Sequence, residues 1–318
     1  GSTVTIQTVT ANKTTINEQT STGVTAPLIK NLSTYESTVE TASNNWKWGA
    51  RNPGIYGNSL RVTVTDAGAD QIVYLAQPTS TEWAFTSGAE VAYSASNTYG
   101  KVFHYNIIVT VKSGSTLVGD WAADNFFTAN SGNVTGRVVA WDRKLRKLEI
   151  TIDGTSSDVL EVNDSLTELA NNSESPGSAT GDSAQIESIE RRLYTVQNSG
   201  SPRFLSNQTI SDANSATIVI ANTADAFAER EYAPGRLWVN TASRPGTSAW
   251  VTERGGRHDL FHVLVTDGDG KLTGTPGSVV EKFLNVSKAA DAKGPQGEAL
   301  YYKDVIKKSK KKDYTLPA

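Results

Sequence analysis

The sequence predicts an α+β protein that is mainly β: a body domain of mixed β-sheet with a few helices, interrupted by an inserted antiparallel β-barrel or sandwich domain. Three observations support this fold class. Short runs of alternating apolar and polar residues recur along the chain. Gly, Ser and Asn separate these runs most densely between about residues 78 and 227. The 318 residues are enough for two domains of ordinary size.

These patterns divide the chain into three parts. We predict a discontinuous body domain over residues 1–77 and 228–306, an inserted β-domain over residues 78–227 and a Lys-rich tail over residues 307–318. The inner boundaries follow the change to many short strands, which begins near Pro78 and ends near Phe227.

The first part of the body domain contains one expected helix and one expected strand. Thr34–Trp48 places Tyr35 and Val39 on one helical face. After a turn at Asn52–Gly54, the segment Leu60–Thr65 alternates apolar and polar side chains. That alternation is typical of a half-buried strand.

The inserted domain is expected to consist of short antiparallel strands. Lys101–Gly114 reads as one strand, and Asn133–Gly154 as a hairpin in which Leu148, Ile150 and Ile152 return with period two. Two segments break this pattern. Asn171–Gln185 is rich in Ser, Gly and Asn, which predicts a mobile surface loop.

The second of these segments, Ile186–Val196, favours a short helix. It places Ile186, Ile189 and Leu193 at spacings of three and four residues. Farther on, the body domain resumes with an expected strand over Leu260–Val265.

The composition excludes several kinds of site. The chain has no cysteine, and therefore no disulfide, thiolate metal site or cysteine nucleophile. No apolar run reaches the roughly 18 residues of a transmembrane helix, and the N-terminus lacks the pattern of a signal peptide. The formal net charge is -3, although six lysines gather in Lys303–Asp313. Because no aromatic residue lies among these lysines, we expect a solvated terminus rather than a nucleic-acid-binding tail.

The segment His258–His262 is the nearest to a catalytic motif. Its sequence HDLFH differs from the zincin pattern HExxH only in Asp259. That pattern works on a helix, where residues four apart can reach one zinc ion. Here the neighbouring residues predict a strand, on which the two histidines stand about 13 Å apart. We expect structural roles for both, and also for His104 within its apolar strand.

The stretch TDGDGKLTG, Thr266–Gly274, looks like the start of a calcium-binding loop. Counted from Asp267, an EF-hand would have Lys271 at position 5, Leu272 where Gly is required and Ser278 in place of the final Glu. The two Asp-Gly pairs after an apolar strand favour a tight hairpin instead.

Other catalytic patterns are absent or weak. The sequence has no Gly-rich phosphate loop and no GxSxG elbow. Glu187 with Glu190, or Glu253 with Asp259, could act as in a glycosidase only if the fold brought the carboxyl groups together. The seven tryptophans could line a sugar-binding surface, but cores and interfaces hold most tryptophans. We therefore expect no catalytic, cofactor-binding or metal-binding residues, no cofactor and no enzymatic activity.

Two long blocks resemble a known protein family. The first, Trp46–Asp66, contains NPGIYGNSL followed by RVTVTD. The second, Tyr232–Ile306, contains RPGTSAWVTERGGRHDLFHVLVTDGDGKLTGTPGSVVEKF, then SKAADAK and YYKDVI. Together they are similar to the sheath proteins of contractile phage tails, of the type found in T-even-like myophages and cyanophages.

The resemblance implies a structural protein of the virion. Sheath subunits stack as hexameric rings around a tail tube, contact the tube and the baseplate, and contract to drive genome ejection during infection. It also implies that the inserted domain is an outer, surface domain. Nucleic acid and membrane insertion are not among the expected partners. The expected location is the virion tail sheath, after assembly in the bacterial host cytoplasm.

The chain departs from the family pattern at its end. It stops soon after YYKDVI, so we expect a fragment that lacks the C-terminal inner domain. The Gly1-Ser2 start and the absence of methionine favour the same interpretation.

Two other functions stay open. The chain could be a β-sandwich adhesin or carbohydrate-binding module that uses exposed Trp and Tyr, or a glycoside hydrolase. In a sheath body, the two points at which the chain enters and leaves the inserted domain should be adjacent. An adhesin should have a shallow aromatic platform. A hydrolase should have a cleft with two facing carboxylates.

Overall fold

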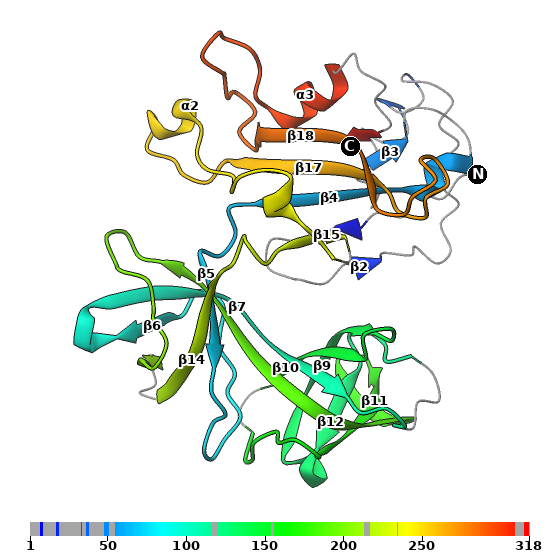
Figure 1. Cartoon of the computed structure of the whole chain (residues 1–318), viewed down its shortest axis with the longest axis vertical. Coiled ribbons are helices and arrows are strands. Elements are labelled where there is room, and N and C mark those ends of the chain that lie inside the picture. Colours follow the sequence, from blue (N-terminus) through cyan, green and yellow to red (C-terminus); the bar gives the residue numbers. More distant parts are fainter. Residues whose placement is uncertain are drawn as a thin grey trace. The chain divides into compact units, whose positions relative to one another are not determined.

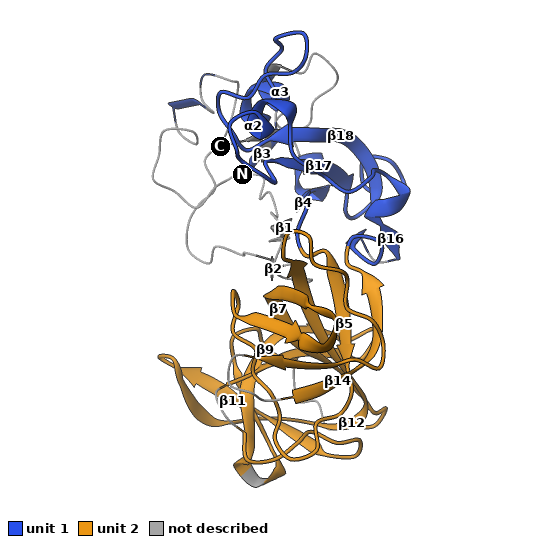
Figure 2. Cartoon of the chain, turned by 90° about the vertical axis from the view of Figure 1, so that its left-hand side faces the viewer, with its two compact units in different colours: residues 1–68, 227–318 blue, residues 69–226 orange. Residues whose placement is uncertain are grey.

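The computed structural model describes residues 7–8, 17–18, 33, 36–37, 48–50, 55–115, 120–153, 156–212, 217–233, 235–308 and 315–317. The chain forms two compact units, drawn in blue and orange in Figure 2. Unit 1 combines residues 1–68 with 227–318, and unit 2 is residues 69–226. The described secondary structure is mainly β (Figure 1).

The largest sheet among the described residues of unit 1 has three strands. These are β4 (Leu60–Asp66), β17 (Leu260–Asp267) and β18 (Ser278–Ser287), in the order β18-β17-β4. Both ladders are antiparallel, so this sheet differs from the mixed sheet that we expected. The strand expected over Leu260–Val265 is confirmed as part of β17.

Both faces of the central strand β17 are covered by apolar side chains, which is why seven of its eight residues are buried. On one face Val263 and Val265 pack with Phe283 and Ile306. On the other face Leu264 packs in a separate cluster with Phe227, Tyr232 and Trp238.

Strand β4 is confirmed, but it is buried on both sides rather than half-buried. Thr63 and Thr65 are each only 1% exposed. The hydroxyl of Thr63 donates to the carbonyl oxygen of Tyr232, and the guanidinium of Arg230 donates to the hydroxyl of Thr65. The hydroxyl groups of these two threonines are thus hydrogen-bonded, although they lie on a buried face of the sheet.

The remaining elements of unit 1 are short. They are β1 (Gln7–Thr8), β2 (Asn17–Glu18), β3 (Trp48–Ala50), η2 (Ile55–Ser59), β15 (Glu231–Ala233), β16 (Arg236–Leu237), η5 (Trp238–Asn240), α2 (Ala249–Thr252), α3 (Tyr302–Lys308) and β19 (Thr315–Pro317). Most of the helix expected over 34–48 and the turn at 52–54 lie outside the described residues, and so does most of the Lys-rich tail. No helix in the described parts of the chain is long and apolar enough to cross a membrane.

The described residues of unit 2 form ten strands that close into a barrel. They are β5 (Gln71–Leu75), β6 (Glu90–Tyr93), β7 (Thr98–Val111), β8 (Phe126–Ala129), β9 (Val134–Asp142), β10 (Lys147–Ile152), β11 (Ser165–Asn172), β12 (Ser175–Gln197), β13 (Thr209–Asp212) and β14 (Thr217–Asp225). Short 3-10 turns follow β6 (η3, Ser94–Ser96) and β8 (η4, Asn130–Gly132). The strand expected from Lys101 and the hairpin expected from Asn133 are confirmed as β7 and as β9 with β10.

Two long strands, β7 and β12, also pair directly with each other, from Gly100 with Gln197 to Val111 with Ile186. This additional ladder divides the closed sheet into two smaller rings. One ring runs β7-β6-β13-β14-β5-β12, and the other runs β7-β10-β9-β8-β11-β12. Figure 1 shows β7 and β12 running together from the β5, β6 and β14 part of the unit to the part that contains β9 to β11.

The alternating side chains of these strands fill one continuous apolar core. Ile107 and Val109 on β7 are fully buried, as are Leu148 and Ile150 on β10. Because each ring is closed, the described strands of unit 2 leave few unpaired edges.

Strand β12 contradicts two of the predictions. Asn171–Gln185, expected as a mobile loop, belongs to β11 and β12, which pair with each other. Ile186–Val196, expected as a helix, is the second half of β12. The main-chain ladders to β7 and β11 determine the conformation here, and they override the local composition.

The two ends of unit 2 lie beside each other within its own sheet. Gln71 on β5 pairs with Asp225 on β14, and the amide of Ala226 donates to the carbonyl oxygen of Asp70. Since β5 pairs with β12 and β14, unit 2 begins at Ala69, earlier than the boundary after Gln77 that the sequence suggested.

Candidate functional site

The two histidines of HDLFH have different surroundings. His258 is exposed and has a left-handed φ of 57° just before β17, whereas His262 is fully buried within that strand. The Nε2 atom of His262 lies 2.8 Å from the carbonyl oxygen of Ser243, and its Nδ1 accepts from the amide of Asn285 at 2.9 Å. Both ring nitrogens are therefore used within the fold.

This pairing fixes the state of His262. Since Nδ1 accepts a hydrogen bond, the ring proton lies on Nε2 and is donated to Ser243. Burial lowers the pKa of the imidazole, against the opposing effect of the Ser243 carbonyl. The neutral imidazole is thus the stable form, and its role is structural.

Asp259 holds together three segments of unit 1. Its carboxylate accepts from the amide and the hydroxyl of Ser248, both at 2.8 Å, and from the hydroxyl of Ser287 at 2.5 Å. Burial alone would raise the pKa of Asp259, but the hydrogen bonds from Ser287 and Ser248 outweigh it and lower the pKa below its usual value. These three donors occupy most of the acceptor positions of the carboxylate.

Asp267 organises the loop after β17 in a similar way. It is fully buried, and its carboxylate accepts from the Ser59 hydroxyl, the Leu272 amide, and both the amide and the hydroxyl of Thr273. Burial acts to raise its pKa, but these donors reverse the shift and lower it.

The loop is therefore longer than the tight hairpin that we expected. β17 and β18 do form an antiparallel hairpin, but Asp267 pairs with Ser278, so ten residues connect the strands. Lys271 contacts the carboxylate of Asp269 at 3.5 Å, so an ammonium stands near the second loop carboxylate. Within the described residues, no three His, Asp or Glu side chains are placed to hold a metal ion.

The suggested carboxylate pairs also have separate partners. Glu187 contacts Arg146 at 3.3 Å, and Glu190 contacts Arg192. Glu253 is 72% exposed and lies beside Arg254, whereas Asp259 is buried. Each of these carboxylates is thus paired with a different group.

The described tryptophans mostly lie in cores. Trp121 and Trp238 are buried, and Trp48, Trp83 and Trp141 pack against the apolar clusters. Outside these clusters, Trp250 stacks on the guanidinium of Arg254 at 3.5 Å.

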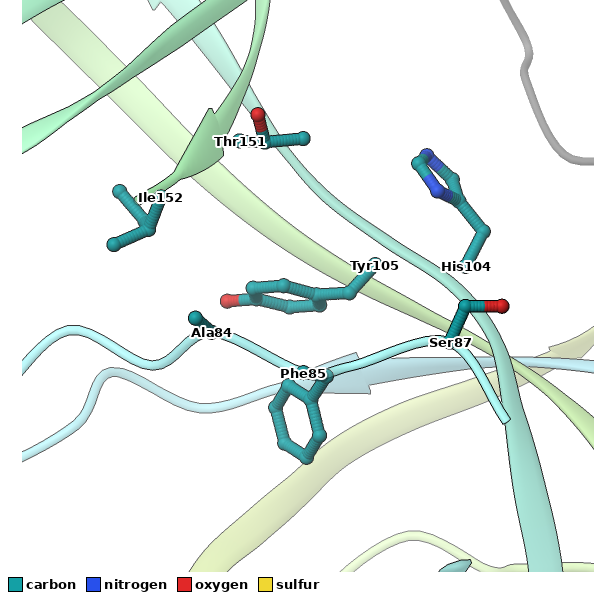
Figure 3. A pocket seen from close by; sticks show the side chains of 7 residues that line it. All are labelled: Ala84, Phe85, Ser87, His104, Tyr105, Thr151 and Ile152. Carbon is teal, nitrogen blue, oxygen red and sulfur yellow. The ribbon is translucent and has the colours of Figure 1, made fainter. Parts of the chain in front are cut away.

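Unit 2 contains a small solvent-open pocket (Figure 3). It lies between the connection after β5, strand β7 and the end of β10, and its volume is about 170 Å³. The lining residues are Ala84, Phe85, Ser87, His104, Tyr105, Thr151 and Ile152. The lining contains no carboxylate, lysine or arginine.

Tyr105 is the most buried polar group of this lining. Its ring meets the Phe85 ring edge to face, with the centroids 4.9 Å apart, and Figure 3 shows it extending toward Ile152 and Ala84. Its hydroxyl is buried, and no described residue supplies it with a hydrogen-bond partner. Burial, reinforced by the nearby Glu82 carboxylate, holds the pKa of Tyr105 far above its usual value, although Arg191 partly opposes the shift.

A buried ion pair positions the wall of the pocket that contains Phe85. Glu82 and Arg191 are almost fully buried, and they form two hydrogen bonds of 2.7 and 2.6 Å. The Glu82 carboxylate also accepts from the Leu160 amide, while Arg191 donates to the Leu160 carbonyl oxygen. The irregular segment that contains Glu82 and Phe85 is thus fastened to β12.

His104, which also lines the pocket, lies 4.0 Å from the carboxylate of Glu149, and that carboxylate accepts a hydrogen bond from Asn106. Sequence reasoning did not find this pocket, because its residues are spread over three segments and match no motif. Comparison with protein-family models, with curated proteins and with solved structures found no match to this chain.

Proposed function

We propose that the chain is a structural, non-enzymatic subunit of a contractile phage tail sheath, which acts through contacts with other sheath subunits, the tail tube and the baseplate. The resemblance of Trp46–Asp66 and Tyr232–Ile306 to sheath proteins suggests this assignment. The observation that supports it best is the way in which unit 2 is inserted. Both of its ends lie together, at Gln71 and Asp225 on neighbouring strands, as an insert with two adjacent crossings requires.

The organisation of the body domain fits this proposal. β4 comes before the insert and β17 after it, yet the two strands pair along their full length, from Leu60 with Asp267 to Asp66 with Phe261. The body is thus held together by its own ladder. A subunit that must keep its shape while its contacts change needs such a body, because contraction draws on the energy difference between two packings of the same subunits.

Repeated heterologous contacts between such subunits would generate the helical array of stacked rings. In this proposal unit 2 is the outer, surface domain. Its two closed rings favour that position, because a closed sheet offers few edges for unwanted pairing with neighbouring copies.

An enzymatic function has less support. The pocket lining contains no carboxylate, and the carboxylates suggested by the sequence are bound to arginines or to serine hydroxyls. A glycosidase requires two carboxyl groups facing each other across the substrate.

Electron microscopy of the complete protein tests the proposal. The purified full-length chain should form tubes of stacked rings over a series of salt concentrations. If the full-length protein stays monomeric at every salt and protein concentration tried, the assignment is wrong.

A further inference from the structure

The segment that connects β17 to β18 contains two Asp–Gly pairs, Asp267–Gly268 and Asp269–Gly270. Such a pair can rearrange without an enzyme, because the amide nitrogen of the glycine can attack the carboxyl carbon of the aspartate side chain. Glycine favours this attack, since it has no side chain in the way and permits unusual backbone angles. The two pairs are chemically alike, so their surroundings decide which of them can react.

The first pair is held at both reacting groups. The carboxylate of Asp267 is fully buried and accepts hydrogen bonds from Ser59, Leu272 and Thr273. The amide of Gly268 donates to the main-chain carbonyl oxygen of Ser59 at 2.6 Å. The attack would require that the carboxylate leave its donors and that the amide leave its acceptor. The folded loop therefore protects this pair.

The second pair lacks these restraints. The Asp269 side chain is 42% exposed, and its carboxylate contacts Arg61 at 3.4 Å and Lys271 at 3.5 Å. Ion pairs between such exposed side chains are weak. The amides of Asp269 and Lys271 both donate to the Ser59 hydroxyl, whereas the Gly270 amide between them donates to no described group. The attacking nitrogen and the carbon that it would attack are thus both available.

The fold itself requires the glycine of the second pair. Gly270 has a φ of 75°, in the left-handed region where residues with a side chain are strained. A Cβ atom at this position would also lie only 2.7 Å from the Cδ atom of Pro276. The turn of the chain thus places a glycine directly after an exposed aspartate, and the reactive pair follows from the shape of the loop.

We propose that Asp269 is a site of spontaneous modification to isoaspartate, and that the fold protects Asp267 from the same reaction. The Gly270 nitrogen attacks the side-chain carboxyl carbon of Asp269. The proton of this nitrogen and the hydroxyl of the neutral carboxyl group leave as water, and a five-membered succinimide ring forms. Water then opens the ring at the main-chain carbonyl, so the main chain passes through the former side chain. One water is lost and one is regained, and no other reactant is needed.

The modification would change this surface of unit 1. The main chain gains one methylene carbon at Asp269, and the negative charge moves to a carboxylate on the other side of that carbon. The contacts with Arg61 on β4 and with Lys271 depend on the original position of the charge, so we expect them to be lost. The inference uses only groups within one copy of the chain and does not rest on the sheath assignment.

Incubation of the full-length protein for several weeks at physiological temperature and pH tests the proposal. Mass spectrometry with electron-transfer fragmentation distinguishes isoaspartate from aspartate, and the tryptic peptide His258–Lys271 contains both pairs. In the folded protein, isoaspartate should accumulate at least about tenfold faster at Asp269 than at Asp267, because several hydrogen bonds must break at Asp267 first. In urea, where the loop is unfolded, the two rates should be similar.

Two substitutions of Asp269 provide controls. Asp269→Glu keeps the negative charge but would have to close a six-membered ring, which forms far more slowly, so no isomer should accumulate at this position. Asp269→Asn can close the same five-membered ring by losing ammonia, and it should form isoaspartate faster than the wild type. Because the side chain is exposed, both variants should remain folded, which far-ultraviolet circular dichroism checks.

The outcomes separate the two pairs. Isoaspartate at Asp269 in the folded protein, with Asp267 affected only in urea, supports the proposal. The proposal is wrong if Asp269 stays unmodified in the folded protein, if Asp267 reacts as fast as Asp269 there, or if Asp269→Asn reacts no faster than the wild type. None of these results bears on tube formation, so the sheath assignment is tested separately.

Discussion

Two buried carboxylates of this chain stabilise the fold by accepting several hydrogen bonds. Asp259 and Asp267 belong to the two segments that resemble metal motifs. Asp259 accepts hydrogen bonds from Ser248 and Ser287, and Asp267 accepts from its own loop and from the distant Ser59. Ser59 and Thr273, which bind Asp267, lie more than two hundred residues apart in the chain. Sequence spacing could not predict the long-range partner Ser59 of Asp267.

The lowered pKa values of Asp259 and Asp267 predict an acid-dependent stability. Both groups are more acidic in the folded chain than in the unfolded chain, so their contribution is fully present above the unfolded value of about 3.9. It should be lost as the pH falls below that value, through the lower folded pKa values. Urea unfolding of the wild type between pH 7 and pH 2 measures this decrease.

Asp267→Asn is the variant that isolates one of these groups. The asparagine side chain has the same size as the aspartate. Its NH₂ group replaces one of the two acceptor oxygens, so a donor then faces other hydrogen-bond donors. We expect it to lose about 1–3 kcal/mol of unfolding free energy at pH 7 and to show a smaller decrease with acid than the wild type. If Asp267→Asn were as stable as the wild type at pH 7, the hydrogen bonds to Asp267 would not stabilise the fold.

The buried pair of Glu82 and Arg191 allows a sharper test of a single interaction. Glu82→Ala leaves the Arg191 guanidinium, which is only 4% exposed, without its carboxylate. We expect a loss of about 3–5 kcal/mol in unfolding free energy, measured by urea denaturation.

The exposed pair of Glu187 and Arg146 provides the control, because both side chains are more than 40% exposed. Glu187→Ala should cost less than about 1 kcal/mol. Equal losses in the two variants would mean that burial does not set the strength of these pairs.

Among the elements, β12 shows most clearly why a local pattern can mislead. Ile186 and Ile189 are three residues apart, as on a helix, but the register with β7 shifts between Ile186 and Ser188. This bulge adds one residue, so both isoleucines can face inward from a strand. The next inward residue is Arg191, whose charge hid the alternation that continues to Leu193.

The bulge predicts opposite outcomes for two length changes in β12. Deletion of Glu187 would make the pairing with β7 regular and keep Ile186 and Ile189 inward, so we expect a loss below about 2 kcal/mol. Insertion of one alanine between Ile189 and Glu190 would turn Arg191 and Leu193 outward, and we expect no cooperative folding. Thermal unfolding followed by circular dichroism distinguishes the two. Similar behaviour of both variants would contradict the assigned register.

Other elements could be predicted from the sequence. The strict alternation of Leu148, Ile150 and Ile152 predicted β10, and the apolar run after Asp259 predicted β17. In both strands most of the buried residues are apolar. The small polar residues of Asn171–Gln185 face mostly outward, so nothing in their side chains indicated the ladder with β11.

At the scale of the whole molecule, unit 2 should fold by itself. Ala69–Ala226 has its own apolar core, and its two ends lie together in one sheet. Expressed alone, this segment is expected to show a single cooperative unfolding transition and a dispersed amide NMR spectrum. A spectrum of an unfolded chain would mean that its core is incomplete without unit 1.

The ladder between β4 and β17 has a mechanical consequence. These strands belong to chain segments on opposite sides of the insert, and they pair over seven residues. Tension that enters before Leu60 and leaves after Asp267 passes across this ladder, so the 158 residues between Gly68 and Phe227 bear none of it while the ladder holds. If the ladder broke, β5 and β14 would be pulled from their adjacent ends and would unzip one hydrogen bond at a time. Because Leu60 pairs with Asp267, this tension would open the β4–β17 ladder from that end one pair at a time, and the insert would come under load only after the ladder had opened.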